Sequence, residues 1–273
     1  MNRRAIIIVC SLVLIVGAVV AVVVSTRRFD GAGTASGGAD TPLVSTPTIA
    51  GNAPTSDEAA KNFGWQRTDG DEFDSNGINP DNWSVYDGRD NAANMTWSAK
   101  QCTVRNGVLT IAGAHDSVGT TCGMAWRENQ TYGRWEVRAR FPAPAAIAYD
   151  PVFLLWPEDD EHWTSIGEID FAEEYDPNRQ YIESWMHGPG NVQAGYWRKY
   201  VDLTKWHNFA VDWQPDHITC YIDGVAWLAL TDTKNVPHQP MHLVLQQNFV
   251  PRTAADVPPI RSTVDVDWVH IYR

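Results

Sequence analysis

Short segments in which apolar and polar residues alternate recur through most of this 273-residue sequence. Gly and Pro punctuate the intervals, and no long stretch holds a helical period. Because successive side chains of a strand point to opposite faces, this alternation is typical of strands with one face in a core. We therefore predict an all-β sandwich for residues 63–273, with strands that include residues 108–111, 132–140, 152–156, 181–186, 207–213, 218–222, 225–227, 242–249 and 264–272.

Residues 5–24 are almost wholly apolar and are flanked on both sides by pairs of arginines. A stretch of this length can cross a bilayer as a helix. A cleaved signal peptide usually has a shorter apolar core followed by a small-residue cleavage site, whereas valines and then two arginines end this one. We therefore favour an uncleaved signal anchor with a transmembrane helix at residues 1–28, and secretion after cleavage is the alternative.

Residues 29–62 are rich in Gly, Ala, Ser, Thr and Pro, which predicts a flexible linker between the membrane and the globular domain. The formal net charge of the chain is −12, although four of its basic residues flank the apolar segment. An acidic domain is poorly suited to nucleic acid, which is held through basic side chains. We expect a monomer that acts on a neutral polymer and binds no nucleic acid.

Three cysteines lie in the globular part. Cys102 and Cys122 stand on either side of a predicted strand, where neighbouring strands could bring them into bridging range, and we hypothesise a disulfide. Cys220 alternates with apolar residues and is expected to be a buried free thiol. These cysteines favour an extracytoplasmic domain at the cell membrane.

Four carboxylates fall within the segment Gly167–Glu174. On a strand, Glu168 and Asp170 project from one face, while Ile169 and Phe171 project from the other and can enter a core. Neighbouring carboxylates raise one another's pKa, which a glycosidase exploits by using one as nucleophile and one as acid. A solvated strand edge and a calcium loop are the alternatives.

The sequence has 13 tryptophans, and aromatic faces stack on sugar rings. Most should be core residues, including Trp135, Trp213, Trp227 and Trp268 in the strand patterns. Trp163 and Trp185 flank the carboxylates and are better placed to bind substrate, whereas Trp156, at the end of the preceding strand, is compatible with either role.

The segment Gly167–Glu174 resembles the Glu-apolar-Asp-x-x-Glu signature of glycoside hydrolase family 16 in its laminarinase-like, endo-β-1,3-glucanase form. The similarity extends over nearly all of the predicted domain, through Asp71–Asp74, Tyr132–Ala139, Phe153–Pro157, Trp213–Gly224 and Val266–Tyr272. It implies a concanavalin A-like β-jelly roll of two curved antiparallel sheets, with a sugar cleft across the concave face. It also implies retaining, endo-acting hydrolysis of β-linked glycans, most readily β-1,3-glucan.

The resemblance assigns Glu168 as nucleophile and Glu173 as general acid/base, with Asp170 between them as a third catalytic residue. Strict alternation from Glu168 would instead turn Glu174 to the cleft. A β-bulge at residues 171–172, which laminarinase-like members carry, inserts one residue and turns Glu173 to that face. We therefore predict the bulge and choose Glu173 over Glu174.

Further site residues follow from the resemblance. The candidate substrate-binding residues are Trp163, Trp185, His187, Trp156, Arg134 and Gln246. Double displacement by carboxylates requires no cofactor, but a structural calcium ligated partly by Asp267 occurs in some relatives. The acidic loop Glu158–Glu161 could help to keep the acid protonated, or could simply face solvent.

The chain departs from the family where a Gly-Gly pair commonly follows a late strand. It reads Gln246–Pro251 instead, followed by a Pro-rich loop to Ser262. Because loops set the sugar subsites, β-galactan, mixed-linkage glucan and the wall polysaccharide of the host stay open as substrates, as does wall remodelling by transglycosylation. The alternative outside enzymes is a lectin-like jelly roll that binds sugar without turnover.

Overall fold

The computed structural model describes residues 56–75 and 77–273. The predicted anchor at residues 1–28 and most of the predicted linker lie outside the described residues. Within the described part of the chain, no helix combines the length and the apolar character needed to cross a membrane.

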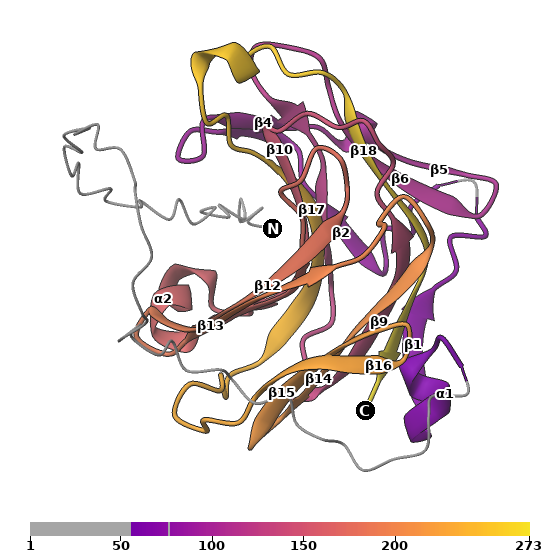
Figure 1. Ribbon diagram of the computed structural model, residues 1–273, viewed down its shortest axis with the longest axis vertical. Helices are drawn as coiled ribbons and strands as arrows, with labels where there is room; N and C mark the ends of the chain where they lie inside the picture. The colour runs from indigo at the N-terminus through magenta and orange to yellow at the C-terminus, as the bar shows by residue number, and fades with distance from the viewer. Residues whose placement is uncertain (1–55, 76) are drawn as a thin grey trace, which may run out of the picture.

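Two curved antiparallel sheets lie face to face, which confirms the all-β sandwich (Figure 1). One sheet, here called the cleft sheet, has the strand order β13 (Val192–Tyr200), β12 (Tyr181–Gly188), β11 (Glu168–Glu173), β10 (Tyr149–Pro157), β17 (Met241–Phe249), β8 (Gly123–Trp126) and β2 (Trp83–Val85). The other, the back sheet, has the order β16 (Val225–Leu230), β15 (His217–Ile222), β14 (His207–Gln214), β9 (Gly133–Arg140), β18 (Ser262–Tyr272), β6 (Val108–Gly113) and β5 (Cys102–Arg105), and β1 (Arg67–Asp71) pairs with β18.

A small third sheet was not predicted. It joins β3 (Gly88–Asp90), β4 (Met95–Trp97) and β7 (Thr120–Thr121), and β4 and β7 run parallel. The described helices are short: α1 (Ala59–Phe63), α2 (Trp163–Ile166) and the 3₁₀ turns η1 (Ala99–Gln101), η2 (Asp160–His162) and η3 (Ala254–Asp256).

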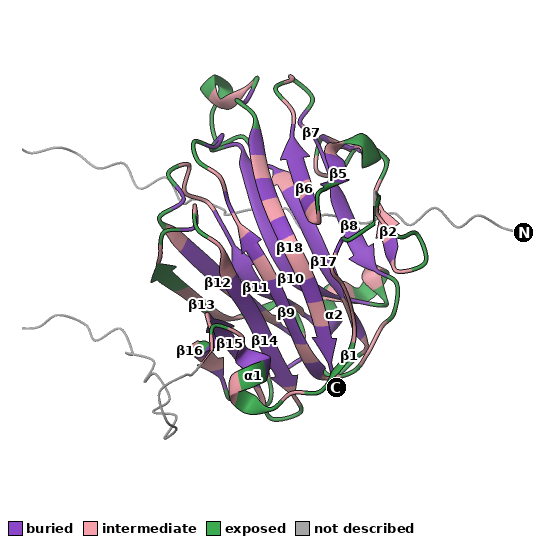
Figure 2. Ribbon diagram, turned by 90° about the vertical axis from the view of Figure 1, so that its right-hand side faces the viewer, coloured by how far each residue is buried: buried purple, intermediate pink, exposed green. Residues whose placement is uncertain are grey.

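The core lies between the two sheets, and period-two alternation decides which side chains enter it (Figure 2). Strand β10 is buried along its whole length. Phe153 and Leu155 pack in the main core with Trp135 and Trp213 of the back sheet. The alternate residues of β10 belong to a second apolar cluster on the opposite face, made of Ala125, Val152, Leu154, Trp156 and Val244.

The predicted linker extends too far toward the C-terminus. Helix α1 begins within it, yet Ala59 is fully buried against Ala210 and Tyr221 of the back sheet. The backbone N–H groups of Ala59 and Ala60 donate hydrogen bonds to the buried carboxylate of Glu136, at 2.8 and 3.3 Å. The folded domain therefore begins before residue 63, because small alanines that read as linker fit closely against the sheet.

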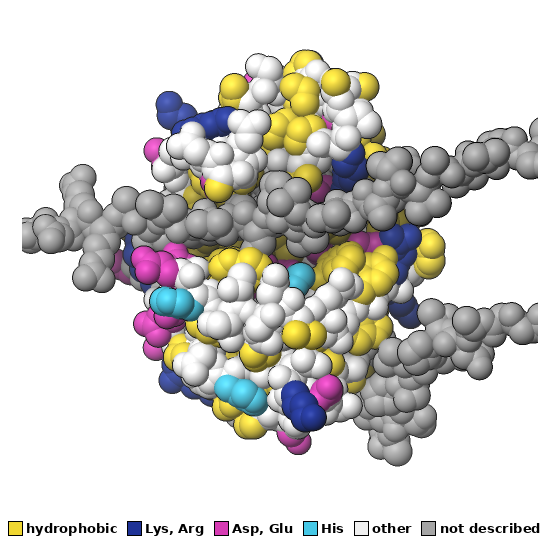
Figure 3. Space-filling model, turned by 90° about the vertical axis from the view of Figure 1, so that its left-hand side faces the viewer, with side chains coloured by type: hydrophobic (Ala, Val, Ile, Leu, Met, Phe, Trp, Pro, Cys, Tyr) yellow, Lys and Arg dark blue, Asp and Glu magenta, His cyan; other side chains and the backbone are white. Residues whose placement is uncertain are grey.

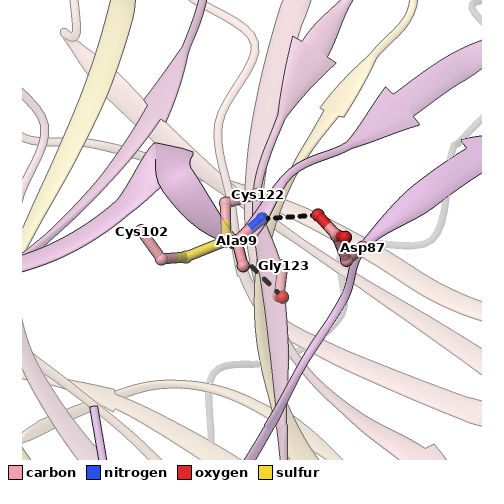
Figure 4. The surroundings of a disulfide bond; sticks show 5 residues. All are labelled: Asp87, Ala99, Cys102, Cys122 and Gly123. Atoms are coloured by element: carbon pink, nitrogen blue, oxygen red, sulfur yellow. Dashed lines mark hydrogen bonds between the residues drawn. A yellow bond between two sulfur atoms is a disulfide. The ribbon is translucent and has the colours of Figure 1, made fainter. Parts of the chain in front are cut away.

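The hypothesised disulfide is present between Cys102 and Cys122, whose Cα atoms are 5.7 Å apart (Figure 4). Cys102 begins β5 of the back sheet, and Cys122 immediately precedes β8 of the cleft sheet. The bond therefore ties the two sheets together at one end of the sandwich. Beside it, the Ala99 N–H donates to Asp87 at 3.1 Å. Cys220 is a buried free thiol, as predicted.

Candidate active site

Strand β11 contains the predicted bulge. Against β10, Asp170 pairs with Leu154 but Ala172 pairs with Phe153, so Phe171 is the extra residue. The register with β12 also slips by one residue between Asp170 and Glu173. Phe171 and Ala172 are both buried in the main core, and the parity of the strand changes after them. Glu173 therefore lines the same cavity as Glu168 and Asp170.

Glu174 has a different environment. Its side chain is fully buried and forms an ion pair with the guanidinium of Arg179, which is also buried. Arg179 in turn donates to the Ser262 hydroxyl at 2.8 Å. The bulge thus directs two adjacent glutamates to different environments. Glu173 lines the cavity, and Glu174 lies in a buried ion pair.

Replacing Glu174 by glutamine is expected to lower the free energy of unfolding by about 3–5 kcal/mol, because it leaves the buried Arg179 charge without its ion-pair partner. The kcat of the protein that remains folded should change little. Urea denaturation, followed by an activity assay on the folded fraction, measures both. Glu158→Gln, on an exposed loop, is the matched control. Unchanged stability together with lost activity would reverse the assignment of the two glutamates.

The catalytic candidates are in close contact across β11 and β12. One carboxylate oxygen each of Glu168 and Asp170 and a ring nitrogen of His187 lie within 4.8 Å of one another. His187 Nε2 is 3.5 Å from Asp170 Oδ2. The Tyr175 hydroxyl donates to Glu173 Oε1 at 2.5 Å.

Burial is the main cause that raises the pKa of both glutamates well above the ordinary range. Next in size is the neighbouring Asp170 carboxylate, which disfavours a further negative charge on either one. The Tyr175 hydrogen bond acts in the other direction on Glu173, because it stabilises the ionised form. The site can therefore hold a carboxylic acid in its neutral form above the pH at which an exposed glutamate ionises.

Two opposing effects act on the pKa of His187. Burial alone would lower its pKa, but its hydrogen bond to Asp170 and the charge of that carboxylate raise it above the ordinary value. The imidazole consequently supplies a positive charge, or a donated proton, next to Asp170 over a wider pH range than a free histidine.

These groups line a cavity of about 570 Å³ on the outer face of the cleft sheet. Figure 3 shows this side of the molecule, where hydrophobic, acidic and histidine side chains are visible along a hollow. Most of the lining comes from β10, β11, β12, β13 and β17. Tyr86, Met95 and Arg252 contribute from outside those strands.

The structure places four of the six predicted substrate-binding residues in the cavity: Trp156, Trp185, His187 and Gln246. Trp163 does not line it but stacks on Trp156, with ring centroids 5.6 Å apart. The indole N–H groups of Trp156 and Trp185 are buried and have no hydrogen-bond partner among the described residues.

The prediction for Arg134 is wrong. Arg134 lies on β9 of the back sheet, where it pairs with Asp212 at 3.1 Å and covers the ring of Trp65. Its neighbour Trp135 points into the core, so alternation turns Arg134 away from the cleft sheet altogether.

Asp267 also lies on the back sheet, in β18, and pairs with Arg138 at 3.1 Å. Among the described residues, no group of three or more Asp, Glu, His or Cys side chains close enough to share a metal ion includes it. The calcium site stays a prediction.

A layer of charged residues surrounds Glu173 and was not predicted from the sequence. Asp150 and Glu183 are buried in the cavity wall and pair with arginines, Asp150 with Arg252 at 3.2 Å and Glu183 with Arg198. The alternation of side chains along a strand could have identified both acids. Asp150 lies on the same face of its strand as Trp156, and Glu183 lies on the same face as Trp185. The loop residue Arg252 carried no such signal. The acidic loop at 158–161 lies outside the cavity lining and is mostly exposed, in line with its solvent-facing interpretation.

Comparison with known proteins adds the family context. The sequence profile of Glycosyl hydrolases family 16 matches residues 89–270. The chain is 24% identical over 255 residues to a beta-glucanase of Rhodothermus marinus, and this match covers 80% of this chain and 88% of that protein. It is 29% identical over 117 residues to a glucan endo-1,3-beta-glucosidase of Cryptopygus antarcticus, or 40% of this chain and 43% of that protein. The fold is similar to the X-ray structure of endo-beta-1,3-glucanase from Pyrococcus furiosus, with a TM-score of 0.66, 21% identity, and coverage of 76% of this chain and 94% of that one.

Proposed function

The chain belongs to glycosyl hydrolase family 16, and we propose that it hydrolyses β-1,3-glucan at internal linkages by a retaining double displacement. It is a glycosidase, and a sugar-binding jelly roll without turnover is not favoured. The observation that carries the proposal is the bulge in β11, which turns Glu173 to the face that carries Glu168 and Asp170, so that all three line one cavity.

In the proposed mechanism Glu168 is the nucleophile and Glu173 the general acid/base. Glu173 protonates the glycosidic oxygen while Glu168 attacks the anomeric carbon, and a glycosyl-enzyme forms. Glu173 then takes a proton from water, which releases the sugar with its original configuration. Asp170, held beside His187, places a negative charge where it discourages early ionisation of Glu173.

The charge of the cavity supports a neutral substrate. Five acidic side chains line it against two arginines, Arg198 and Arg252, and each arginine is paired with one of those acids. The one histidine of the lining, His187, already contacts Asp170. The cavity therefore offers no unpaired cation to an anionic glycan, which favours a neutral one. The ring of Trp185, which lines the cavity and is partly exposed, can cover an apolar sugar face.

We also propose that the domain acts outside the cytoplasm at the cell membrane. The apolar segment at residues 5–24 supports this location, and the Cys102–Cys122 disulfide is typical of oxidising compartments. A catalytic domain on a tether of this kind could reach a neutral polysaccharide of the envelope.

Release of reducing sugar from a panel of polysaccharides tests the proposed substrate. Laminarin, a β-1,3-glucan, should be cleaved faster than mixed-linkage β-glucan and β-galactan, with early formation of oligosaccharides, and anionic alginate should not be cleaved. Faster cleavage of β-galactan would replace the proposed substrate. Products longer than the starting oligosaccharide would show transglycosylation, and binding without turnover of every glycan would contradict the hydrolase.

A further inference from the structure

We propose that Tyr175 is a positioning residue that fixes which oxygen of Glu173 carries the catalytic proton. The inference rests on the proposed role of Glu173 as general acid/base. The Tyr175 hydroxyl donates to Glu173 Oε1 at 2.5 Å, and both residues line the cavity. With Oε1 engaged as an acceptor, the proton of the neutral acid resides on Oε2.

The hydroxyl of Tyr175 is the donor in this pair. Burial, followed by the charges of Glu173 and Asp150, raises the pKa of Tyr175 well above its ordinary value. The phenol therefore keeps its proton throughout the pH range in which Glu173 titrates. The hydrogen bond persists in both protonation states of Glu173 and is stronger when the carboxylate is ionised.

A second layer of residues holds the ring of Tyr175. The guanidinium of Arg252 lies 5.3 Å from the ring centroid, at the distance of a cation–π contact. Arg252 is itself fixed by Asp150 at 3.2 Å and by the carbonyl of Ile147. The main chain of its loop is tied by the Val250 N–H, which donates to Ala148 at 2.7 Å.

This arrangement gives a role to the departure of the chain from its family. Arg252 belongs to the Pro-rich loop that follows Gln246–Pro251, the segment that stands in place of the usual Gly-Gly pair. The side chain of Asp256 accepts hydrogen bonds from the backbone N–H groups of Arg252 and Thr253. The loop that the sequence marks as unusual therefore supports the residue that contacts the proposed acid.

The proton balance explains why the choice of oxygen matters. In the first step Oε2–H gives its proton to the glycosidic oxygen, the anomeric C–O bond breaks, and Glu168 forms the new bond. The negative charge that develops on Glu173 is stabilised by the Tyr175 hydrogen bond at Oε1. In the second step the water proton returns to Oε2 as the water oxygen attacks the anomeric carbon.

Several charged groups face Glu173 and determine where it titrates. They are Glu168 and Asp170 on its own strand, Asp150 on β10, and Glu183 on β12. Asp170, Asp150 and Glu183 raise the pKa of Glu173 after the larger effect of burial, and Glu168 and Glu173 disfavour each other's ionisation. Tyr175 is the neighbour that lowers the pKa of Glu173. Removal of the hydroxyl should consequently move the titration of Glu173 to higher pH.

The test is Tyr175→Phe, which deletes the hydroxyl and keeps the ring under Arg252. On laminarin, kcat/KM should fall about 10- to 100-fold, the effect of one hydrogen bond to a charged group, and the basic limb of the pH–rate profile should move to higher pH. On dinitrophenyl β-laminaribioside, whose leaving group needs no proton, kcat/KM should change little. If laminarin is not the substrate, the panel glycan that the wild type cleaves, with its own dinitrophenyl glycoside, replaces it.

Tyr132→Phe is the matched control, because its hydroxyl contacts His238 at 2.9 Å and lies outside the cavity lining. This variant should keep the wild-type rate and pH profile. An unshifted profile in Tyr175→Phe, or an equal loss on both substrates, would overturn the positioning role. Failure of the wild type to cleave any glycan would instead overturn the proposed function, so the two failures are distinguishable.

Discussion

Replacing Glu168 by glutamine is expected to lower kcat on β-1,3-glucan by about 10⁴-fold or more, because the covalent intermediate can no longer form. The change removes one charge from a site in which burial, Asp170 and Glu173 all disfavour ionisation of Glu168. The folded protein should therefore be at least as stable as the wild type, and laminarin should still bind. Reducing-sugar release, substrate binding and thermal denaturation measure the three effects.

Chemical rescue makes this expectation specific to the nucleophile. In Glu168→Ala the side chain is short enough to admit a small anion, and added azide should restore turnover and give a glycosyl azide of inverted configuration. Glu158→Gln on the exposed loop should keep full activity. Activity of Glu168→Gln within tenfold of the wild type would exclude Glu168 as the nucleophile.

The strands of the sandwich could be predicted because alternation of apolar and polar residues records which side chains enter a core. The order of the strands could not. Strand β10 lies between β11 and β17, although more than eighty residues separate the end of β10 at Pro157 from the start of β17 at Met241. The wrong prediction for Arg134 follows from this. Alternation shows that Arg134 and Trp135 point to opposite faces of their strand, but it does not show to which sheet that strand belongs.

The catalytic face of β11 required more than alternation. Period two alone would have turned Glu174 to the cleft, and only the extra residue shared with laminarinase-like sequences favoured Glu173. The structure contains that bulge at Phe171. Local sequence carries no comparable signal for Arg252 or Glu136, whose contacts depend on how a loop and helix α1 meet distant strands. Long-range pairing is thus the part of the site that sequence reasoning could not reach.

Replacing Glu173 by alanine is expected to lower kcat/KM on laminarin by about 10²- to 10⁴-fold, the usual contribution of general acid catalysis. Dinitrophenyl β-laminaribioside should still form the glycosyl-enzyme, because its leaving group departs without a proton. The second step then lacks its base, so a burst of dinitrophenol should precede slow turnover. Azide should accelerate that turnover and give a glycosyl azide of retained configuration, opposite to the product from Glu168→Ala.

The pH dependence gives the same assignment a second, independent readout. Burial and Asp170 raise the pKa of Glu173, so its acid form persists to higher pH, and loss of this proton should produce the basic limb of the wild-type profile for kcat/KM on laminarin. That limb should lie above the ordinary range of a glutamate and should disappear in Glu173→Ala. Glu174→Gln should retain it, because Glu174 is held in the Arg179 ion pair away from the cavity. A basic limb that survives in Glu173→Ala and disappears in Glu174→Gln would mean that Glu174, and not Glu173, is the general acid.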